Sequence, residues 1–184
     1  MKQVKKRKGD HMAVKLFIAQ TLDGYIADKQ DNLDWLMAVE GEGDNGISRF
    51  LSSVDIVIMG SRTYQWLLDQ KLETWPYEDK MTYVFSRQSW EDKANIKFVH
   101  PSNLTSFVKE LQGEIWLVGG GQLIKDFMEA DLIDEYQVTI APVILGEGIP
   151  LFPQGKYATD LELQGTTRYG QFVELAYKRK TKAK

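Results

Sequence analysis

Short runs of consecutive apolar residues recur along the chain, and segments with helical spacing separate them. Residues 56–59 and 115–118 are apolar at every position, which is typical of strands buried on both faces of a parallel sheet. Between such runs, apolar residues recur at helical intervals, as in Leu123, Ile124 and Phe127, which predicts helices with one apolar face. This alternation predicts βα units and a mostly parallel sheet.

The last third of the chain has a different pattern. Residues 135–140, 161–167 and 172–178 are strand-like, and no helical segment separates them. We therefore expect antiparallel edge strands at the C-terminal end of the sheet. The predicted fold is α/β, with three layers: a mostly parallel central sheet, helices on both of its faces, and these antiparallel strands at one edge.

Residues 28–45 stand apart because they are rich in Asp, Glu and Gly and contain few apolar residues that could anchor them. Such a composition predicts a short helical turn inside a long loop. We interpret this loop as a lid over a site at the end of the sheet. The spacing of apolar residues in 47–54 then predicts a helix that leads into the strand at 56–59.

The composition of the chain excludes several classes of protein. The chain has 184 residues, 43% of them hydrophobic and 27% charged, which fits one folded domain. It has no Cys and two His, so disulfides, thiolate metal sites and a cysteine nucleophile are excluded, and we predict no metal. No apolar run approaches the ~20 residues that a membrane helix needs. With no signal-like segment either, we expect a cytoplasmic protein.

Charge is distributed unevenly along the chain. Residues 1–11 hold five Lys or Arg and one Asp, and residues 178–184 hold five Lys or Arg. Residues 12–177 keep 13 basic against 25 acidic residues, a net charge near −12. Such a surface repels nucleic acid, so we expect none as a partner. The domain division is a basic tail at 1–11, native or left from cloning, a single domain at 12–178 and a basic tail at 179–184.

Three predicted strands end in residues that suit a phosphate group. Glycines allow the backbone to approach a pyrophosphate, and the free N–H groups at the start of a helix favour an anion. Arg62 and Arg87 are two of the four arginines in residues 12–177, and each follows a strand beside a hydroxyl residue. A guanidinium so placed suits the monophosphate that distinguishes NADP from NAD. The three strand-end segments are 60–63, 86–87 and 119–121.

Four segments, in this order, resemble the dihydrofolate reductase superfamily, and most closely the branch that includes the reductase domain of bacterial riboflavin biosynthesis. They are residues 18–27 (IAQTLDGYIA), 57–64 (VIMGSRTY), 118–123 (VGGGQL) and 140–152 (IAPVILGEGIPLF). The resemblance extends over residues 14–152. It implies a central sheet of about eight strands that binds NADPH at its carboxyl edge.

The resemblance also assigns roles to individual residues. It places Ala19 and Ile26 beside the nicotinamide, Gly60, Ser61, Arg62, Thr63, Ser86 and Arg87 around the adenosine end, and Gly119, Gly120, Gly121, Gln122 and Leu123 around the pyrophosphate. This sequence departs from the family pattern at Ser61, because relatives often place Arg directly after the glycine. The choice between NADPH and NADH is left open at this point.

Reduction of a C=N bond needs a proton donor. Classical members of the superfamily carry a carboxyl group on the helix before the Met-Gly strand, and counting back from Gly60 without gaps places Asp44 there. Asp34 is a rival, and each has a structural alternative: Asp44 as a helix cap and Asp34 as a solvated loop acid. Tyr64 is placed to reach both cofactor and substrate, unless it belongs to the core.

The expected activity is that of an NADPH-dependent oxidoreductase resembling dihydrofolate reductase or phosphoribosylaminouracil reductase. Hydride would pass to a small heterocycle that is pteridine-like or ribosylaminopyrimidine-like. The riboflavin enzyme is usually fused to a zinc-binding deaminase, for which this chain has neither the length nor the Cys, so a stand-alone paralogue fits equally well. The alternative is a non-catalytic or sensory dinucleotide-binding domain. In relatives the segment 142–152 often lies near a dimer contact, so we expect a homodimer.

Overall fold

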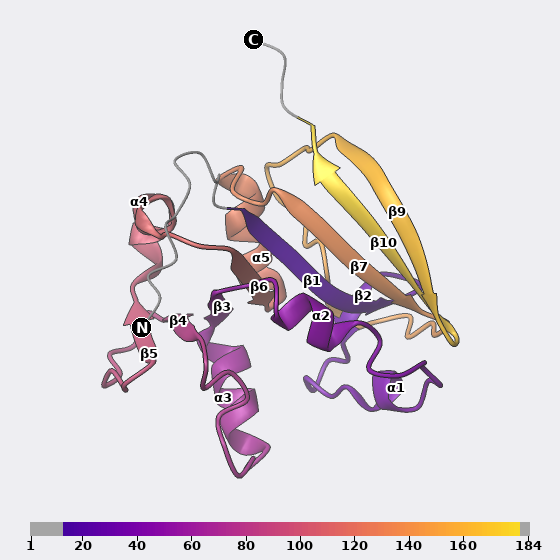
Figure 1. The fold of residues 1–184 in the computed structure, drawn as a ribbon, viewed down its shortest axis with the longest axis horizontal. Coiled ribbons are helices and arrows are strands. Elements are labelled where there is room, and N and C mark those ends of the chain that lie inside the picture. Colours follow the sequence, from indigo (N-terminus) through magenta and orange to yellow (C-terminus); the bar gives the residue numbers. More distant parts are fainter. Residues whose placement is uncertain (1–12, 181–184) are drawn as a thin grey trace, which may run out of the picture.

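The computed structural model describes residues 13–180, in which one large sheet and a short two-stranded ribbon carry all the strands (Figure 1). The strands are β1 (Val14–Thr21), β2 (Tyr25–Ala27), β3 (Ile56–Gly60), β4 (Met81–Phe85), β5 (Ile96–Val99), β6 (Ile115–Gly119), β7 (Glu135–Ala141), β8 (Ile149–Pro150), β9 (Leu161–Tyr169) and β10 (Phe172–Arg179). The helices are α1 (Asp34–Met37), α2 (Ile47–Leu51), α3 (Ser61–Asp69), η1 (Pro101–Asn103), α4 (Leu104–Glu110) and α5 (Gly121–Glu129).

The large sheet has eight strands in the order β5-β4-β3-β6-β1-β7-β10-β9. The first six strands in this order, from β5 at the edge to β7, pair in parallel. Strand β10 pairs antiparallel with both β7 and β9. The predicted three-layer α/β fold with antiparallel C-terminal strands is confirmed. The ribbon of β2 and β8 was not predicted, and it joins the loop after β1 to the segment before Leu151.

One predicted strand runs in a different direction from the one expected. Residues 135–140 were grouped with the antiparallel strands, but β7 runs parallel to β1 over seven residue pairs. The reason is that α5 crosses over between β6 and β7, so β7 enters the sheet in the same direction as β6. The antiparallel arrangement begins only at β10, whose connection to β9 is a tight turn at Gly170, where φ is 59°.

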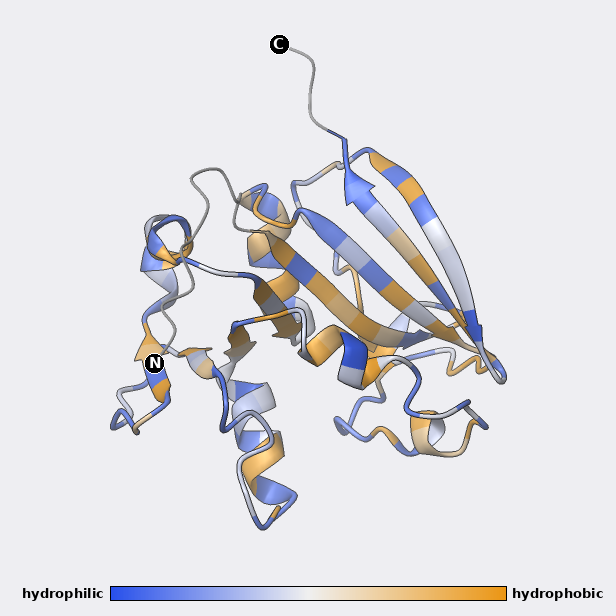
Figure 2. Ribbon diagram, viewed as in Figure 1, coloured by the Kyte–Doolittle hydropathy of each residue, from blue (hydrophilic) through white to orange (hydrophobic). Residues whose placement is uncertain are grey.

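Two apolar clusters fix the helices to the two faces of the sheet. Helices α4 and α5 supply buried residues to the larger cluster on one face. Helices α2 and α3 supply Phe50 and Tyr64 to the cluster on the other face, where the Phe50 and Phe17 rings stack with centroids 4.2 Å apart. Figure 2 shows the apolar residues concentrated on the central strands and on the helix faces turned toward them. Side chains therefore alternate between an α5 face and an α2 face along each strand.

The long loop at residues 28–45 is attached to the carboxyl end of the sheet. It contains α1, whose Trp35 is buried against Ala141 and Phe172. Farther along, the Gln171 N–H donates to Glu40 O at 3.0 Å. The predicted short helical turn is present, and the loop lies beside the β9–β10 turn (Figure 1).

No helix in residues 13–180 has both the length and the apolar character that crossing a bilayer requires. The predicted tail at 1–11, and residues 181–184 of the tail predicted at 179–184, lie outside the described part of the chain. The domain boundaries therefore stay predictions.

Candidate functional site

The carboxyl ends of β4, β3 and β6 lie side by side at one edge of the sheet. Gly60 of β3 is level with Phe85 of β4, and Met59 of β3 is level with Gly119 of β6. Because all three strands are parallel, the segments that follow them leave the sheet at the same edge. The segments brought together in this way are 60–63, 86–87 and 119–123.

Glycines keep the space between the ends of β3 and β6 free of side chains. A Cβ atom at Gly60 would lie 3.7 Å from Gly119 O and 3.9 Å from Gly120 N. Gly119 has a φ of 123°, a conformation that residues with a side chain rarely adopt. The two strand ends therefore present bare backbone, which a phosphate group can approach closely.

Two helix N-termini open onto this edge. Helix α3 begins at Ser61 and α5 begins at Gly121, directly after β3 and after the Gly119-Gly120 turn. Neither helix has a side-chain cap, and neither has an acidic residue in its first turn. The first N–H groups of each helix are thus free of side-chain acceptors, and the helix dipoles add partial positive charge. An anion is the ligand that this arrangement favours.

Arg62 extends from the first turn of α3 to a residue of the long loop. Its Nη2 lies 2.7 Å and its Nε 3.0 Å from Asp31 Oδ2, and 73% of its side chain remains exposed. An ion pair this exposed contributes little to stability, about 0–1 kcal/mol. It does hold the guanidinium group in place at the site edge.

Arg87 occupies a tight turn after β4. The buried hydroxyl of Ser86 accepts from the Gln88 N–H at 3.0 Å and donates to Gln88 O at 3.0 Å, which shapes this turn. Arg87 itself is exposed, and it forms no ion pair with another residue in the range 13–180. Its charge is therefore available to a ligand.

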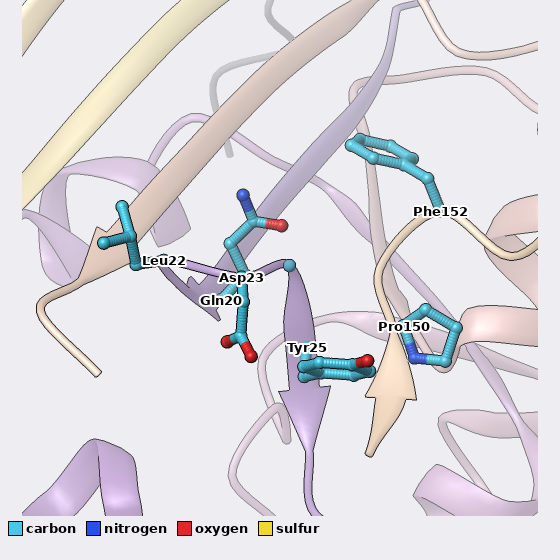
Figure 3. A pocket seen from close by; sticks show the side chains of 7 residues that line it. Gln20, Leu22, Asp23, Tyr25, Pro150 and Phe152 are labelled. Carbon is cyan, nitrogen blue, oxygen red and sulfur yellow. The ribbon is translucent and has the colours of Figure 1, made fainter. Parts of the chain in front are cut away.

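An open hollow of about 440 Å³ lies where β1 ends (Figure 3). Gln20 of β1 and Tyr25 of β2 lie on one side of it, and Pro150 of β8 and Phe152 lie on the other. The hollow adjoins the glycine turn, because a Cβ atom at Gly121 would lie 2.8 Å from Pro150 O. A ligand that extends along the edge from α5 would reach this hollow.

The loop between β1 and β2 is held by Asp23. Its Oδ1 accepts from the Thr21 hydroxyl at 2.6 Å, and its Oδ2 accepts from the Gly146 N–H at 2.7 Å. These hydrogen bonds, the one from Thr21 above all, hold the pKa of Asp23 below its usual value of 3.8. The carboxylate thus joins the 21–25 loop to residues 145–146, and the sequence pattern did not reveal this role.

The side chains of the remaining predicted cofactor residues lie in different surroundings. Ala19 of β1 is half-buried and its side chain is on the α2 face, whereas Ile26 packs against the cluster on the α5 face. In α5, Leu123 belongs to the core and the Gln122 Nε2 donates to Asp126 Oδ1 at 2.8 Å. Any contact of these two α5 residues with a ligand would therefore be made by the backbone.

The sequence of this chain matches a known family over nearly all of its length. A family model, the RibD C-terminal domain, matches residues 12–175. The chain belongs to the RibD C-terminal domain family. Two Bacillus subtilis (strain 168) relatives are the uncharacterized protein YwjB, 44% identical over 171 residues (89% of this chain and 96% of that protein), and the uncharacterized protein YyaP, 32% identical over 177 residues (88% and 92%).

Solved structures show the same fold. A putative riboflavin biosynthesis protein from Shewanella sp. PV-4 is 31% identical, with a TM-score of 0.79, and the match covers 92% of this chain and all of that one. A dihydrofolate reductase from Enterococcus faecalis complexed with NADP(H) and RAB-propyl has a TM-score of 0.66 at 16% identity, covering 92% of this chain and 97% of that one. At that identity the likeness concerns the fold alone. It places this RibD C-terminal domain in the dihydrofolate reductase-like fold.

The two candidate proton donors of this RibD C-terminal domain are both exposed. Asp44 Oδ1 accepts from the Gly46 N–H at 3.0 Å and Oδ2 accepts from the Ser48 N–H at 2.8 Å, so its carboxylate holds the turn that begins α2. Hydrogen bonding from Ser48 is the main cause that holds the pKa of Asp44 below 3.8. Asp34 is exposed in the first turn of α1. The capping alternative thus describes the contacts that Asp44 makes.

Tyr64 is a core residue, which decides between the two alternatives that the sequence left open. It is 1% exposed, and its ring lies against Trp75, Trp90 and Phe98 with centroids 5.4 to 5.7 Å apart. The Lys93 Nζ donates to its hydroxyl at 3.1 Å. The residue follows the strand-end motif in sequence, but helical geometry turns it back toward the sheet.

Sequence reasoning missed a buried carboxyl group, that of Glu174 in β10. Only 4% of Glu174 is exposed. Burial raises its pKa, and the positive charge of Arg49 offsets part of this rise. A signal was present: Glu174 alternates with Phe172 and Ala176 in a strand, so it shares their inward face. No group of three His, Asp or Glu residues within 13–180 is arranged to hold a metal ion.

We predict that Asp44→Ala lowers the stability of the domain, because Gly46 and Ser48 lose their acceptor. The contribution of Asp44 is present at neutral pH and is lost as the pH falls below 3.8 and through the lower pKa of the folded state. Urea midpoints at neutral and acidic pH measure this difference, with Asp34→Ala as the matched control. A difference that grows on acidification would contradict the capping role.

Proposed function

We propose that this domain is an NADPH-dependent reductase that transfers hydride to a small heterocyclic substrate, either pteridine-like or ribosylaminopyrimidine-like. The reductase-like fold follows from the family and its neighbours. The cofactor and the substrate class are our inference. It draws support from the site, from a neighbour that was solved with NADP(H), and from a relative named as a putative riboflavin biosynthesis protein.

The observation that carries the proposal is the anion-binding edge. Bare strand ends at Gly60 and Gly119, the N-termini of α3 and α5, and two exposed guanidinium groups all lie there. The surrounding domain is acidic, with a net charge near −12 over residues 12–177. A positive edge on a negative domain indicates selection for an anionic ligand. A dinucleotide with an extra monophosphate has the length and the charge to contact both ends of this edge.

The direction of the bound cofactor follows from where the charges lie. Arg62 and Arg87 lie beyond the ends of β3 and β4, so they suit the adenosine end and its monophosphate. The glycine turn after β6 suits the pyrophosphate, and the end of β1 beside Ala19 suits the nicotinamide end. Substrate would then lie next to the nicotinamide on the same α2 face, over β7, where α1 and α2 cover the sheet.

One observation favours the alternative of a non-catalytic dinucleotide-binding domain. Asp44 is exposed, and its depressed pKa leaves it without a proton at neutral pH. Oxidation of NADPH in the presence of dihydropterins and ribosylaminopyrimidines separates the two functions. A binding domain would hold NADPH without consuming it.

The homodimer and the cytoplasmic location stay predictions. The segment 142–152 exposes two large apolar side chains, with 71% of Ile144 and 43% of Phe152 accessible. Such side chains suit a contact between two copies. Light scattering tests this, and a mass near the 21.1 kDa of one chain would contradict it.

We expect NADPH to quench the tryptophan fluorescence of the wild-type domain with a dissociation constant below millimolar. Gly60→Ala should weaken this binding at least tenfold, because its methyl group would occupy the gap between the ends of β3 and β6. The fold should tolerate the change, because the new Cβ atom would be no closer than 3.7 Å to its neighbours and the φ at Gly60 is −79°. Unchanged binding in a folded Gly60→Ala protein would place the dinucleotide elsewhere.

Arg87→Ala should lower the affinity for NADPH by about 10- to 100-fold, the value of one charge-assisted contact. Affinity for NADH should change much less, because NADH lacks the monophosphate. Arg168→Ala is the control, since Arg168 lies on β9 and its Nε donates to Gly170 O at 2.7 Å. Equal losses for NADPH and NADH would remove the assigned role of Arg87.

A further inference from the structure

Glu174 lies in a row of side chains that crosses the sheet at the candidate site. Ala19 of β1 is level with Thr139 of β7, and Thr139 is level with Glu174 of β10. Residues level with one another on neighbouring strands point to the same face, here the α2 face. Glu174 is therefore on the same face as Ala19, two strands away, or about 10 Å.

The surroundings of Glu174 offer little to balance its charge. Its neighbours in the row, Thr139 on β7 and Thr167 on β9, are neutral. The charged group that acts on it is Arg49 on α2, whose Nη2 donates to the Tyr169 hydroxyl at 3.2 Å. Within residues 13–180 its carboxyl group forms no hydrogen bond and no ion pair. It is an acid on a side chain that is largely buried, without a direct partner in the protein.

A second buried polar group lies close by without a partner. Trp35 packs against Ala141 and Phe172, which form the next row toward the edge of the sheet. Its Nε1–H donor is buried and has no acceptor among the described residues. A donor and an acid therefore lie on adjacent rows of one face, and both lack hydrogen-bond partners in the protein.

Such an arrangement is costly for the fold. A buried polar group without a hydrogen bond destabilises a protein, and burial of an acid favours its protonated form. An apolar side chain at position 174 would fill the same space on the α2 face with a smaller loss of stability. Buried acids of this kind concentrate at functional sites, where a ligand supplies the missing partner.

We propose that Glu174 is the catalytic proton donor of this domain, in a role that rests on the reductase function proposed above. Nicotinamide at Ala19 would place the reacting ring of the substrate over Thr139, between the cofactor and Glu174. The side chain of a glutamate on β10 spans the remaining strand spacing. The Trp35 N–H, which lies near the adjacent row of the same face and lacks an acceptor, would donate to an oxygen or nitrogen of the same ring.

The chemical step balances without any further reactant. NADPH gives a hydride to the carbon of the substrate C=N bond and becomes NADP⁺. The nitrogen takes the proton of the Glu174 carboxyl group, the C=N bond becomes a CH–NH single bond, and Glu174 is left as a carboxylate. Solvent returns the proton to Glu174 before the next turnover.

This assignment differs from the one that the sequence led to. Asp44 lies before α2, is exposed and holds its carboxylate against backbone N–H groups. Glu174 comes from the opposite end of the chain, is buried, and lies in the side-chain row of Ala19. The site thus draws its acid from the antiparallel part of the sheet instead of from the helix before β3.

The test compares wild type with Glu174→Gln and with a matched control, Glu162→Gln, which makes the same change on the exposed face of β9 in the same hairpin. Three quantities are measured on the full chain: NADPH affinity by fluorescence, NADPH oxidation with dihydrofolate, and binding of a diaminopyrimidine to the NADPH complex. The protonated diaminopyrimidine ring offers paired N–H donors to a carboxylate. Thermal unfolding checks that each variant folds, and Glu174→Asp replaces Glu174→Gln if the latter does not.

The proposal expects Glu174→Gln to keep the NADPH affinity of wild type, to bind the diaminopyrimidine at least tenfold more weakly and to lose about 100-fold or more in turnover. Wild-type turnover should fall as the pH rises through the pKa of Glu174, and this dependence should be absent from Glu174→Gln. If Glu174→Gln matches Glu162→Gln, the proposal fails. It also fails if wild type binds NADPH but neither probe. Absence of NADPH binding in wild type instead overturns the proposed function itself.

Discussion

The parallel pairing of β3 with both β4 and β6 sets the position of each group at the cofactor edge. Gly60, the turn at Gly119 and the residues after Phe85 lie together because these strands are level with one another. The helices that follow begin where the strands stop, so their free N–H groups face the same region. A slip of one residue in this register would turn the buried side chains of β3 to the wrong face, so the core and the site depend on the same hydrogen bonds.

Much of this edge could be predicted from the chain alone. The strands at 56–59 and 115–118 are apolar at each position because both faces are covered, and such runs have few alternative structures. Once those strands are parallel, the residues after them necessarily meet. The partner of β7 could not be found in the same way. Its pairing with β1 depends on the path of α5 over the sheet, and no pattern within residues 135–140 encodes that path.

The side chains that act through tertiary contacts were harder to find. Tyr64 follows the Gly60 motif closely in sequence, but the helix turns it into an aromatic cluster. Asp44 was located by counting, and the sequence left open whether it donates a proton or caps the following helix; its oxygens accept from N–H groups at the start of α2. Glu174 was overlooked because acids in edge-like strands usually face water, whereas here α2 and the α1 loop cover that face. The positions of Tyr64 and Glu174 are set by packing against other elements, whereas the contacts of Asp44 are local.

The contact between Arg62 and Asp31 has a consequence for how rigidly the site is organised before any ligand arrives. Two N–H groups of the guanidinium are directed at one carboxylate oxygen, so the plane of the group is fixed while its other donors stay free. A negative residue beside an anion site would ordinarily be counted as harmful. Here it removes rotamer freedom that a bound phosphate would otherwise have to remove. Asp31 thus orients the guanidinium group of Arg62 for the phosphate that would compete with Asp31 for it.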